Sequence, residues 1–469
     1  MSNSFRTRQD IISASRRGDS LYSIYQRLKE SEIFIKEQQK NAFELLFETL
    51  LPSLSEEQAQ ELAKFPTNSL EIYISTLSIS VAKILYQFSG YGLLCTLKHL
   101  DSETAKILAQ FQGKVLGLVE LEQLDEATAK NLALYKGNAL YLSGLKHIDQ
   151  AIAKALFLFR GSLCINESLN IDELEEIDKE AEKGLTLAKK GNYFYLNGFK
   201  QIDESLAKIL AQYDGTGLSL KGLKQLDEKI AKALARFKGE MLSLNGLTDI
   251  NEVVAKALAR FKGNYLDLNG LKKLNDGVAK TLALFKCKEL YLEGLEEIDE
   301  VTAKALFRFR GERIALNGVK KIDKKVAKWL SQFQGEVLYL NGLKEIDELT
   351  AKALAQFKGW FSLNGVKQID EAVAKELSQF KGDVLHLNGV QQLDEATAVA
   401  FAQRDGVIYL NGVKQINEIT AQALAQFKGH ALLLDGLQQL DESTAKVLAQ
   451  YKGTILTTEK ISVQIQQFK

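Results

Sequence analysis

The sequence is poor in the residues on which most enzyme and metal sites depend. Its 469 residues include four histidines and three cysteines. His99 and His147 occupy equivalent positions two repeats apart, which places them roughly 10 Å from each other, and His386 has no second candidate ligand beside it. The sequence contains no phosphate-binding loop, no G-x-S-x-G elbow and no H-E-x-x-H motif. We therefore expect no catalytic residue, no metal and no cofactor.

Other absences concern the location of the protein and its class of partner. No run approaches the ~20 apolar residues of a membrane span, and the N-terminus lacks the apolar core of a signal peptide. The cysteines are odd in number and far apart, which favours a reducing compartment. Lys plus Arg equals Asp plus Glu, at 60 each, so no overall field attracts nucleic acid. These features predict a cytoplasmic protein without membrane or nucleic-acid contacts.

What the sequence does contain is a repeat. Residues 337–359 read VLYLNGLKEIDELTAKALAQFKG, and glycines equivalent to Gly359 recur along the chain, with Cys287 in place of one of them. The steps between these positions are 23 or 24 residues, apart from one step of 30 between Gly161 and Gly191. The unit predicts a short strand with Leu340 facing the core, an Asn-Gly bend, and a short helix with Asp347 as its N-cap. We expect Gly359 to end that helix in the left-handed conformation. Alanines mark 17 such units, and units of this size bury their apolar faces only by stacking.

The period and the pattern L-x-L-x-x-L-x-x-I-D-x-x-x-A-x-x-L-A resemble the leucine-rich repeat. The helical half is most similar to the cysteine-containing, ribonuclease-inhibitor-like subfamily, with Leu343 at the position of its cysteine, and to an Asp-Glu-x-x-Ala-Lys variant of bacterial repeat proteins. The resemblance covers roughly residues 54–458. It implies an α/β solenoid, a horseshoe with a parallel sheet on the concave face and short helices on the convex face, that binds proteins and has no catalytic activity.

The chain divides into three parts around this repeat. Residues 1–53 are expected to form an N-terminal arm and a helical cap, in which residues 1–20 are either a frayed terminus or a basic arm. Residues 54–458 form the solenoid, with an irregular 30-residue unit at 162–191. Residues 459–469 are expected to cap the far end as a short strand. Both prolines, Pro52 and Pro66, lie where the cap meets the repeats, which suits strands that exclude proline.

A row of lysines along the predicted helices has two interpretations. Considered without its neighbours, the lysine row predicts a basic ridge that binds nucleic acid. Glutamate stands four residues before many of these lysines, as in Glu126–Lys130 and Glu371–Lys375, and this order stabilises a helix by a few tenths of a kcal/mol. We expect the row to support the helices.

The predicted concave face carries aromatic residues at three and five positions before the bend glycine. The first set is Tyr141, Tyr195, Tyr291, Tyr339, His386 and Tyr409, and the second is Tyr193, Tyr265 and Trp360. Exposed aromatics are typical of binding hot spots, whereas the alternative is that tyrosine simply suits strands. We predict that they bind a protein partner. An asparagine column one position before the glycine is predicted to bond along the sheet.

The irregular unit is strongly acidic. Between Glu167 and Glu182 it holds eight carboxylates against one lysine, and we predict that Glu173, Glu175, Glu176 and Asp178 dock a basic partner segment. The alternative is a neutral insertion, which solenoids tolerate.

The function that these features favour is a non-enzymatic scaffold that binds a protein partner on its concave face. The alternative is a sensor or regulatory subunit of a larger signalling or defence assembly, with the helical N-terminus as its effector contact.

Overall fold

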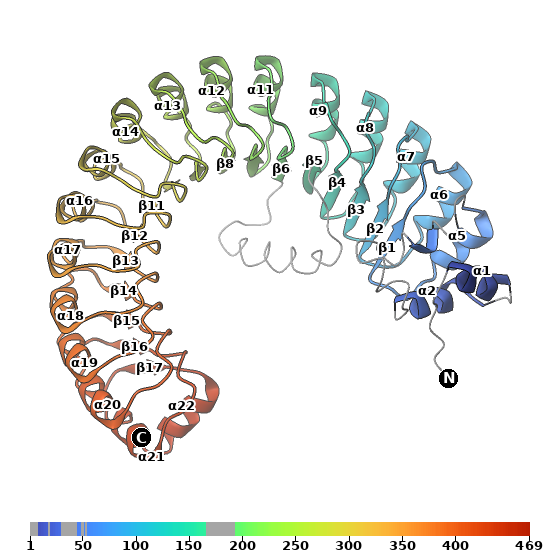
Figure 1. Ribbon diagram of the computed structural model, residues 1–469. Helices are drawn as coiled ribbons and strands as arrows, with labels where there is room; N and C mark the ends of the chain where they lie inside the picture. The colour runs from blue at the N-terminus through green and yellow to red at the C-terminus, as the bar shows by residue number, and fades with distance from the viewer. Residues whose placement is uncertain (1–7, 17–18, 30–44, 48–50, 52–53, 166–192) are drawn as a thin grey trace. The chain divides into compact units, whose positions relative to one another are not determined.

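The structure is a computed structural model of the chain that describes all residues except 1–7, 17–18, 30–44, 48–50, 52–53 and 166–192 (Figure 1). It consists of two compact units, Met1–Gly222 and Leu223–Lys469. Each unit is an α/β solenoid in which short parallel strands alternate with short helices.

The first unit begins with two helices and continues with the repeats. Its elements are α1 (Arg8–Arg16), α2 (Leu21–Lys29), α5 (Glu56–Leu62), β1 (Ser69–Ile72), α6 (Ile79–Leu85), β2 (Gly92–Cys95), α7 (Ser102–Leu108), β3 (Val115–Leu118), α8 (Glu126–Leu132), β4 (Ala139–Leu142), α9 (Gln150–Leu156), β5 (Ser162–Ile165), β6 (Tyr193–Tyr195), α11 (Glu204–Leu210) and β7 (Gly217–Ser219). Each of its strands pairs in parallel with the next.

The second unit repeats the same plan and ends in a helix. Its elements are α12 (Glu228–Leu234), β8 (Met241–Ser243), α13 (Glu252–Leu258), β9 (Tyr265–Asp267), α14 (Asp276–Leu282), β10 (Glu289–Tyr291), α15 (Glu300–Leu306), β11 (Arg313–Ala315), α16 (Lys324–Leu330), β12 (Val337–Tyr339), α17 (Glu348–Leu354), β13 (Trp360–Ser362), α18 (Glu371–Ser378), β14 (Val384–His386), α19 (Glu395–Ala402), β15 (Val407–Tyr409), α20 (Glu418–Ala425), β16 (Ala431–Leu433), α21 (Glu442–Leu448), β17 (Thr454–Leu456) and α22 (Glu459–Gln466). Equivalent residues pair, as Leu338 does with Phe361.

A single repeat shows why this sequence folds in this way. In β12, Leu338 is fully buried, and so is Leu340 just after the strand. The Asp347 carboxylate accepts a hydrogen bond from the backbone N–H of Thr350 at 2.7 Å, which confirms it as the N-cap of α17. The core between sheet and helices is therefore built from the residues that the repeat pattern predicted.

The role predicted for Gly359 is wrong. Helix α17 ends at Leu354, and its C-cap Ala355 is right-handed. A Cβ atom on Gly359 would lie 2.2 Å from the carbonyl oxygen of Glu336 and 2.7 Å from the Phe357 ring. Glycine is therefore needed because the neighbouring backbone approaches closely. Among the described glycines, positive φ is found at Gly406, at 81°.

Aromatic residues two positions before the glycines equivalent to Gly359 stack from one repeat to the next. In the first unit, the centroids of Phe88 and Phe111 lie 6.4 Å apart and those of Tyr135 and Phe159 lie 5.9 Å apart. In the second unit, the series Phe309, Phe333 and Phe357 has spacings of 6.3 and 6.2 Å. We call this series the phenyl column; all its members are buried.

The asparagine column forms a ladder, as predicted. The side-chain oxygen of Asn341 accepts from the backbone N–H of Asn364 at 2.9 Å, and that of Asn364 accepts from Asn388 at 2.9 Å. The same bond runs from Asn411 to Asn388 at 3.1 Å and from Asp435 to Asn411 at 3.0 Å. Each bond joins one repeat to the next and satisfies a backbone donor at the bend.

The lysine row forms several of the predicted ion pairs. Lys130 lies 2.5 Å from Glu126, and Lys208, Lys232 and Lys375 pair in the same way with Glu204, Glu228 and Glu371. Lys352 instead reaches Glu376 of the next repeat at 3.3 Å. These pairs are exposed, so each contributes little to stability.

Described parts of both terminal segments differ from expectation, whereas residues 1–7 and 17–18 lie outside the described residues. Residues 8–16 form helix α1, in which Ile11 and Ala14 are fully buried, so this part is neither frayed nor a free arm. The final segment is helix α22 and not a strand. Its Ile461 and Ile465 are four residues apart and both are buried, so the helical spacing prevails over the β-favouring composition of this segment.

Candidate binding surface

The strands of the second unit present two faces with different roles. Leu338 and Leu340 point into the core, whereas Tyr339 between them is half-buried on the opposite face. Within this unit the strands line the inner side of the curve and the helices the outer side (Figure 1). The predicted assignment of inward and outward positions is therefore confirmed for this repeat.

Six of the predicted site residues lie on the inner face of the second unit. We call them the aromatic face: Tyr265, Tyr291, Tyr339, Trp360, His386 and Tyr409. Five are half-buried, and Trp360 is 54% exposed. Because they stand on strands in continuous register, their positions relative to one another are fixed by the sheet.

The first unit holds three further predicted residues. Tyr193 and Tyr195 stack within β6, with ring centroids 5.8 Å apart. Tyr141 is only 7% exposed and packs in a cluster with Leu94, Val115 and Cys164. The expectation of an exposed aromatic is therefore wrong for Tyr141, because neighbouring strands place apolar side chains around it. The acidic residues Glu173, Glu175, Glu176 and Asp178 lie outside the described residues.

An ion pair that the sequence analysis missed lies within the aromatic face. Arg313 Nη1 donates to Glu289 Oε1 at 2.6 Å across β10 and β11. Glu289 is 5% exposed and also accepts from the Tyr291 hydroxyl at 2.7 Å. Both charged residues stand five positions before the bend glycine, next to each other in that column. Aligning the repeats column by column would have paired them, since side chains opposite each other on adjacent strands interact.

The surroundings of this pair keep the nearby phenols protonated. Burial raises the pKa of Tyr291, and its hydrogen bond to Glu289 raises that pKa further. Burial also raises the pKa values of Tyr265 and Tyr339. The tyrosines are therefore neutral hydroxyl donors at physiological pH, and one of them is held in place by a buried carboxylate.

A second contact orders the aromatic face further along the unit. The rings of His386 and Tyr409, on adjacent strands, stack at 4.0 Å between centroids with an interplanar angle of 22°. Burial lowers the pKa of His386 from its usual 6.5. The imidazole is therefore neutral at pH 7 and acts as a flat packing surface.

This arrangement predicts a pH dependence of stability. Because the folded pKa of His386 lies below its unfolded value, the unfolded chain binds the proton more readily, and the free energy of unfolding falls as pH drops from about 7 to about 5.5. His386→Gln is expected to show a smaller fall, measured by urea denaturation at both pH values. The control His430→Gln changes an exposed histidine, and its free energy of unfolding should decrease between the two pH values as much as that of the wild type. Equal decreases in all three proteins would contradict the prediction.

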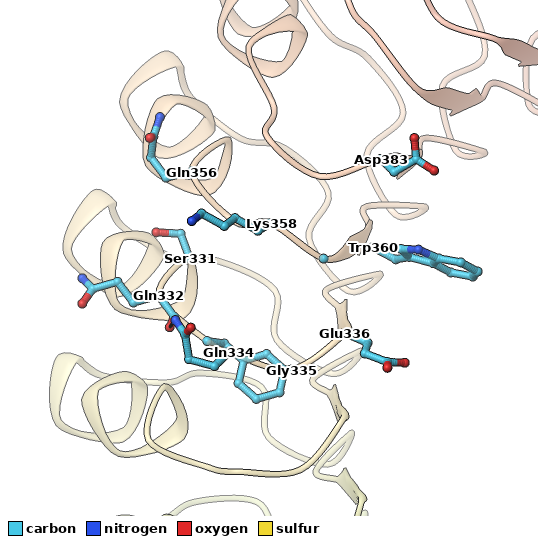
Figure 2. Close-up of a pocket in the computed structure, with 11 residues that line it drawn as sticks. Ser331, Gln332, Gln334, Gly335, Glu336, Gln356, Lys358, Trp360 and Asp383 are labelled. Carbon is cyan, nitrogen blue, oxygen red and sulfur yellow. Dashed lines mark hydrogen bonds between the residues drawn. The ribbon is translucent and has the colours of Figure 1, made fainter.

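An open groove of about 770 Å³ runs past the start of β13. Figure 2 shows the Trp360 indole on the strand side of this groove with Glu336 and Asp383, whereas Lys358 and Gln356 lie toward the helices. The groove therefore joins the aromatic face at its most exposed residue.

Among the residues that the structure describes, no three His, Cys, Asp or Glu side chains are grouped so that they could hold a metal ion. None of the described helices combines the length and apolar character needed to cross a membrane.

No family model and no curated protein match the sequence. Solved structures similar to this chain include one from the Drosophila Toll–Spatzle complex (11% identity, TM-score 0.45, 84% of this chain and 50% of that chain), the TLR13–ssRNA13 complex (15%, 0.31, 82% and 62%) and an internalin from Listeria monocytogenes (13%, 0.30, 91% and 93%). The chain thus spans half the length of the Toll-complex chain. By its own repeat geometry, the fold is a leucine-rich-repeat solenoid.

Proposed function

We propose that this chain is a non-enzymatic scaffold that binds a protein partner on the aromatic face of its second unit. The observation that carries the proposal is the series of partly exposed tyrosines, one tryptophan and an arginine on strands in fixed register. Tyr, Trp and Arg are the residues most enriched at binding hot spots. A surface already ordered before binding loses little conformational entropy when the partner arrives.

The remaining predicted contacts are part of the same proposal. Tyr193 and Tyr195 in the first unit, and the four acidic residues of the irregular unit, would add contacts to the partner. We further propose a cytoplasmic protein of bacterial type. Burial raises the pKa of Cys95 and of Cys287 to about 12, so both thiols are inert. Three buried cysteines that form no disulfide suit a reducing compartment.

The test compares the two faces of the same repeats. Tyr339→Ala with Tyr409→Ala removes two aromatics from the inner face, and Leu349→Ala with Ile419→Ala removes two exposed residues from the following helices. Each chain is used to capture partners from a lysate of its source cell, and Kd is then measured with the purified partner. Losing two hot-spot residues is expected to weaken binding about 30-fold or more.

Circular dichroism and thermal melting establish that both double variants remain folded. The helix-side variant should bind the partner as the wild type does. If the helix-side variant loses the partner and the tyrosine variant keeps it, binding takes place on the helices and the proposal is wrong.

A further inference from the structure

Trp360 differs from the other members of the aromatic face in its exposure and its neighbours. It starts β13 and is 54% exposed, and it pairs with Val337 of β12 on one side. On the other side Phe361 pairs with Leu385, and the same register extended by one residue places Val384 next to Trp360. Both valines are buried. An exposed indole between two apolar residues is a flat surface that can cover the stem of a long side chain.

Two carboxylates stand at the edge of this surface. Glu336 and Asp383 are exposed, directly precede the two valines, and lie on the indole side of the groove (Figure 2). In the described part of the chain neither forms an ion pair. Beneath Asp383 lies Arg404, whose guanidinium donates to the Asp383 backbone carbonyl at 2.8 Å. The positive charge of this guanidinium partly balances the negative charge of the Asp383 carboxylate. The position that corresponds to Arg404, 21 residues after Glu336, is Phe357.

The other tryptophan of the chain, Trp329, contacts both a carboxylate and a cation. Trp329 Nε1 donates to Glu300 Oε1 at 3.3 Å, and Lys304 Nζ lies 5.3 Å from the centroid of the indole ring. This site on the outer side of the unit thus contains an indole, a carboxylate and a cation. Trp360 has the indole and the carboxylates, whereas Lys358, a lysine that lines the same groove, lies toward the helices (Figure 2).

We propose that Trp360, Glu336 and Asp383 form a subsite for an arginine side chain of the protein partner. This inference rests on the proposed function and names the chemistry of one contact. The guanidinium stacks on the indole face, as arginine does on aromatic rings, its methylene stem passes over Val337 and Val384, and its charge lies near Glu336.

The test uses the fluorescence of Trp360 alone. The chain has two tryptophans, so Trp329→Phe leaves Trp360 as the single indole while keeping an aromatic ring on the outer side. This variant is titrated at constant ionic strength with the blocked peptide Gly-Gly-Arg-Gly-Gly. A saturable change in emission is expected, and the same peptide with citrulline, which lacks the charge, should give none.

Substitutions of the two carboxylates in the Trp329→Phe variant test which of them contacts the arginine. Glu336→Gln is expected to lower the affinity for the arginine peptide about fivefold, since exposed ion pairs contribute modestly. Asp383→Asn should lower this affinity less, because Arg404 already offsets the charge of Asp383. Trp360→Phe in the wild-type background leaves Trp329, whose emission should not respond. An equal response to the citrulline peptide, or full affinity in Glu336→Gln, would overturn the subsite.

The subsite and the proposed function can fail separately. Retention of the partner by the Tyr339 and Tyr409 double variant contradicts the binding face, whatever the arginine peptide does. Loss of the partner in that variant, together with no arginine response at Trp360, leaves the binding face in place and removes only the arginine subsite.

Discussion

Leu340→Ala is expected to lower the free energy of unfolding by about 2–5 kcal/mol. Leu340 is fully buried, and its backbone N–H donates to the Ser362 carbonyl of the next repeat at 2.9 Å. Removing three side-chain carbons leaves a cavity that the stacked backbones cannot close. Because solenoid repeats interact mainly with their neighbours, the loss should appear as faster amide hydrogen exchange in β11, β12 and β13.

Leu349→Ala is the matched control in the same repeat. Leu349 lies on α17 and is 52% exposed, so its truncation should change stability by less than about 0.5 kcal/mol. Equal exchange rates in the two variants would mean that the inward and outward positions have been assigned to the wrong faces.

Arg404→Ala is expected to cost about 2–5 kcal/mol, comparable to truncation of a large core side chain. Arg404 is 1% exposed and occupies the place that phenylalanine takes in the phenyl column. Its guanidinium lies 5.1 Å from the Phe380 ring and donates to the carbonyls of Phe380, Gly382, Asp383 and Val407. Truncation leaves both a void and carbonyls without donors, and each buried unpaired group adds a penalty.

Two further variants separate volume from hydrogen bonding at this position. Arg404→Phe restores the phenyl column and should be less destabilising than Arg404→Ala. Arg308→Ala removes an exposed arginine on the outer side and should be close to neutral. Thermal melting of the three variants checks this order, and a wild-type melting temperature for Arg404→Ala would show that the buried guanidinium does not support the fold.

Features encoded within one repeat could be predicted from the sequence. Alternation of Leu338 and Leu340 defines the strand, and Asp347 sits directly before a helical pattern, so neither needs information from elsewhere in the chain. The asparagine ladder was also predictable, because an identical residue at a fixed position in a stack must meet its equivalent. Local patterning and repetition together therefore determined the solenoid.

Features that depend on contacts between repeats were missed or misjudged. A glycine at a helix C-cap and one at a close backbone approach look alike in the sequence, so Gly359 was assigned the wrong role. The burial of Tyr141 depends on apolar residues contributed by other strands. The pairing of Glu289 with Arg313 becomes visible only when the equivalent positions of adjacent repeats are compared. In α22, the apolar residues suit either a strand or a helix until packing selects one.

The asparagine ladder has a direction that matters during synthesis of the chain. In each bond the acceptor, such as the Asn341 side chain, belongs to the earlier repeat, and the donor, the Asn364 backbone N–H, belongs to the later one. A ribosome delivers the N-terminal repeat first, so every emerging repeat meets an acceptor that is already in place. Folding during translation can therefore proceed one repeat at a time, with each finished bend acting as a template for the next.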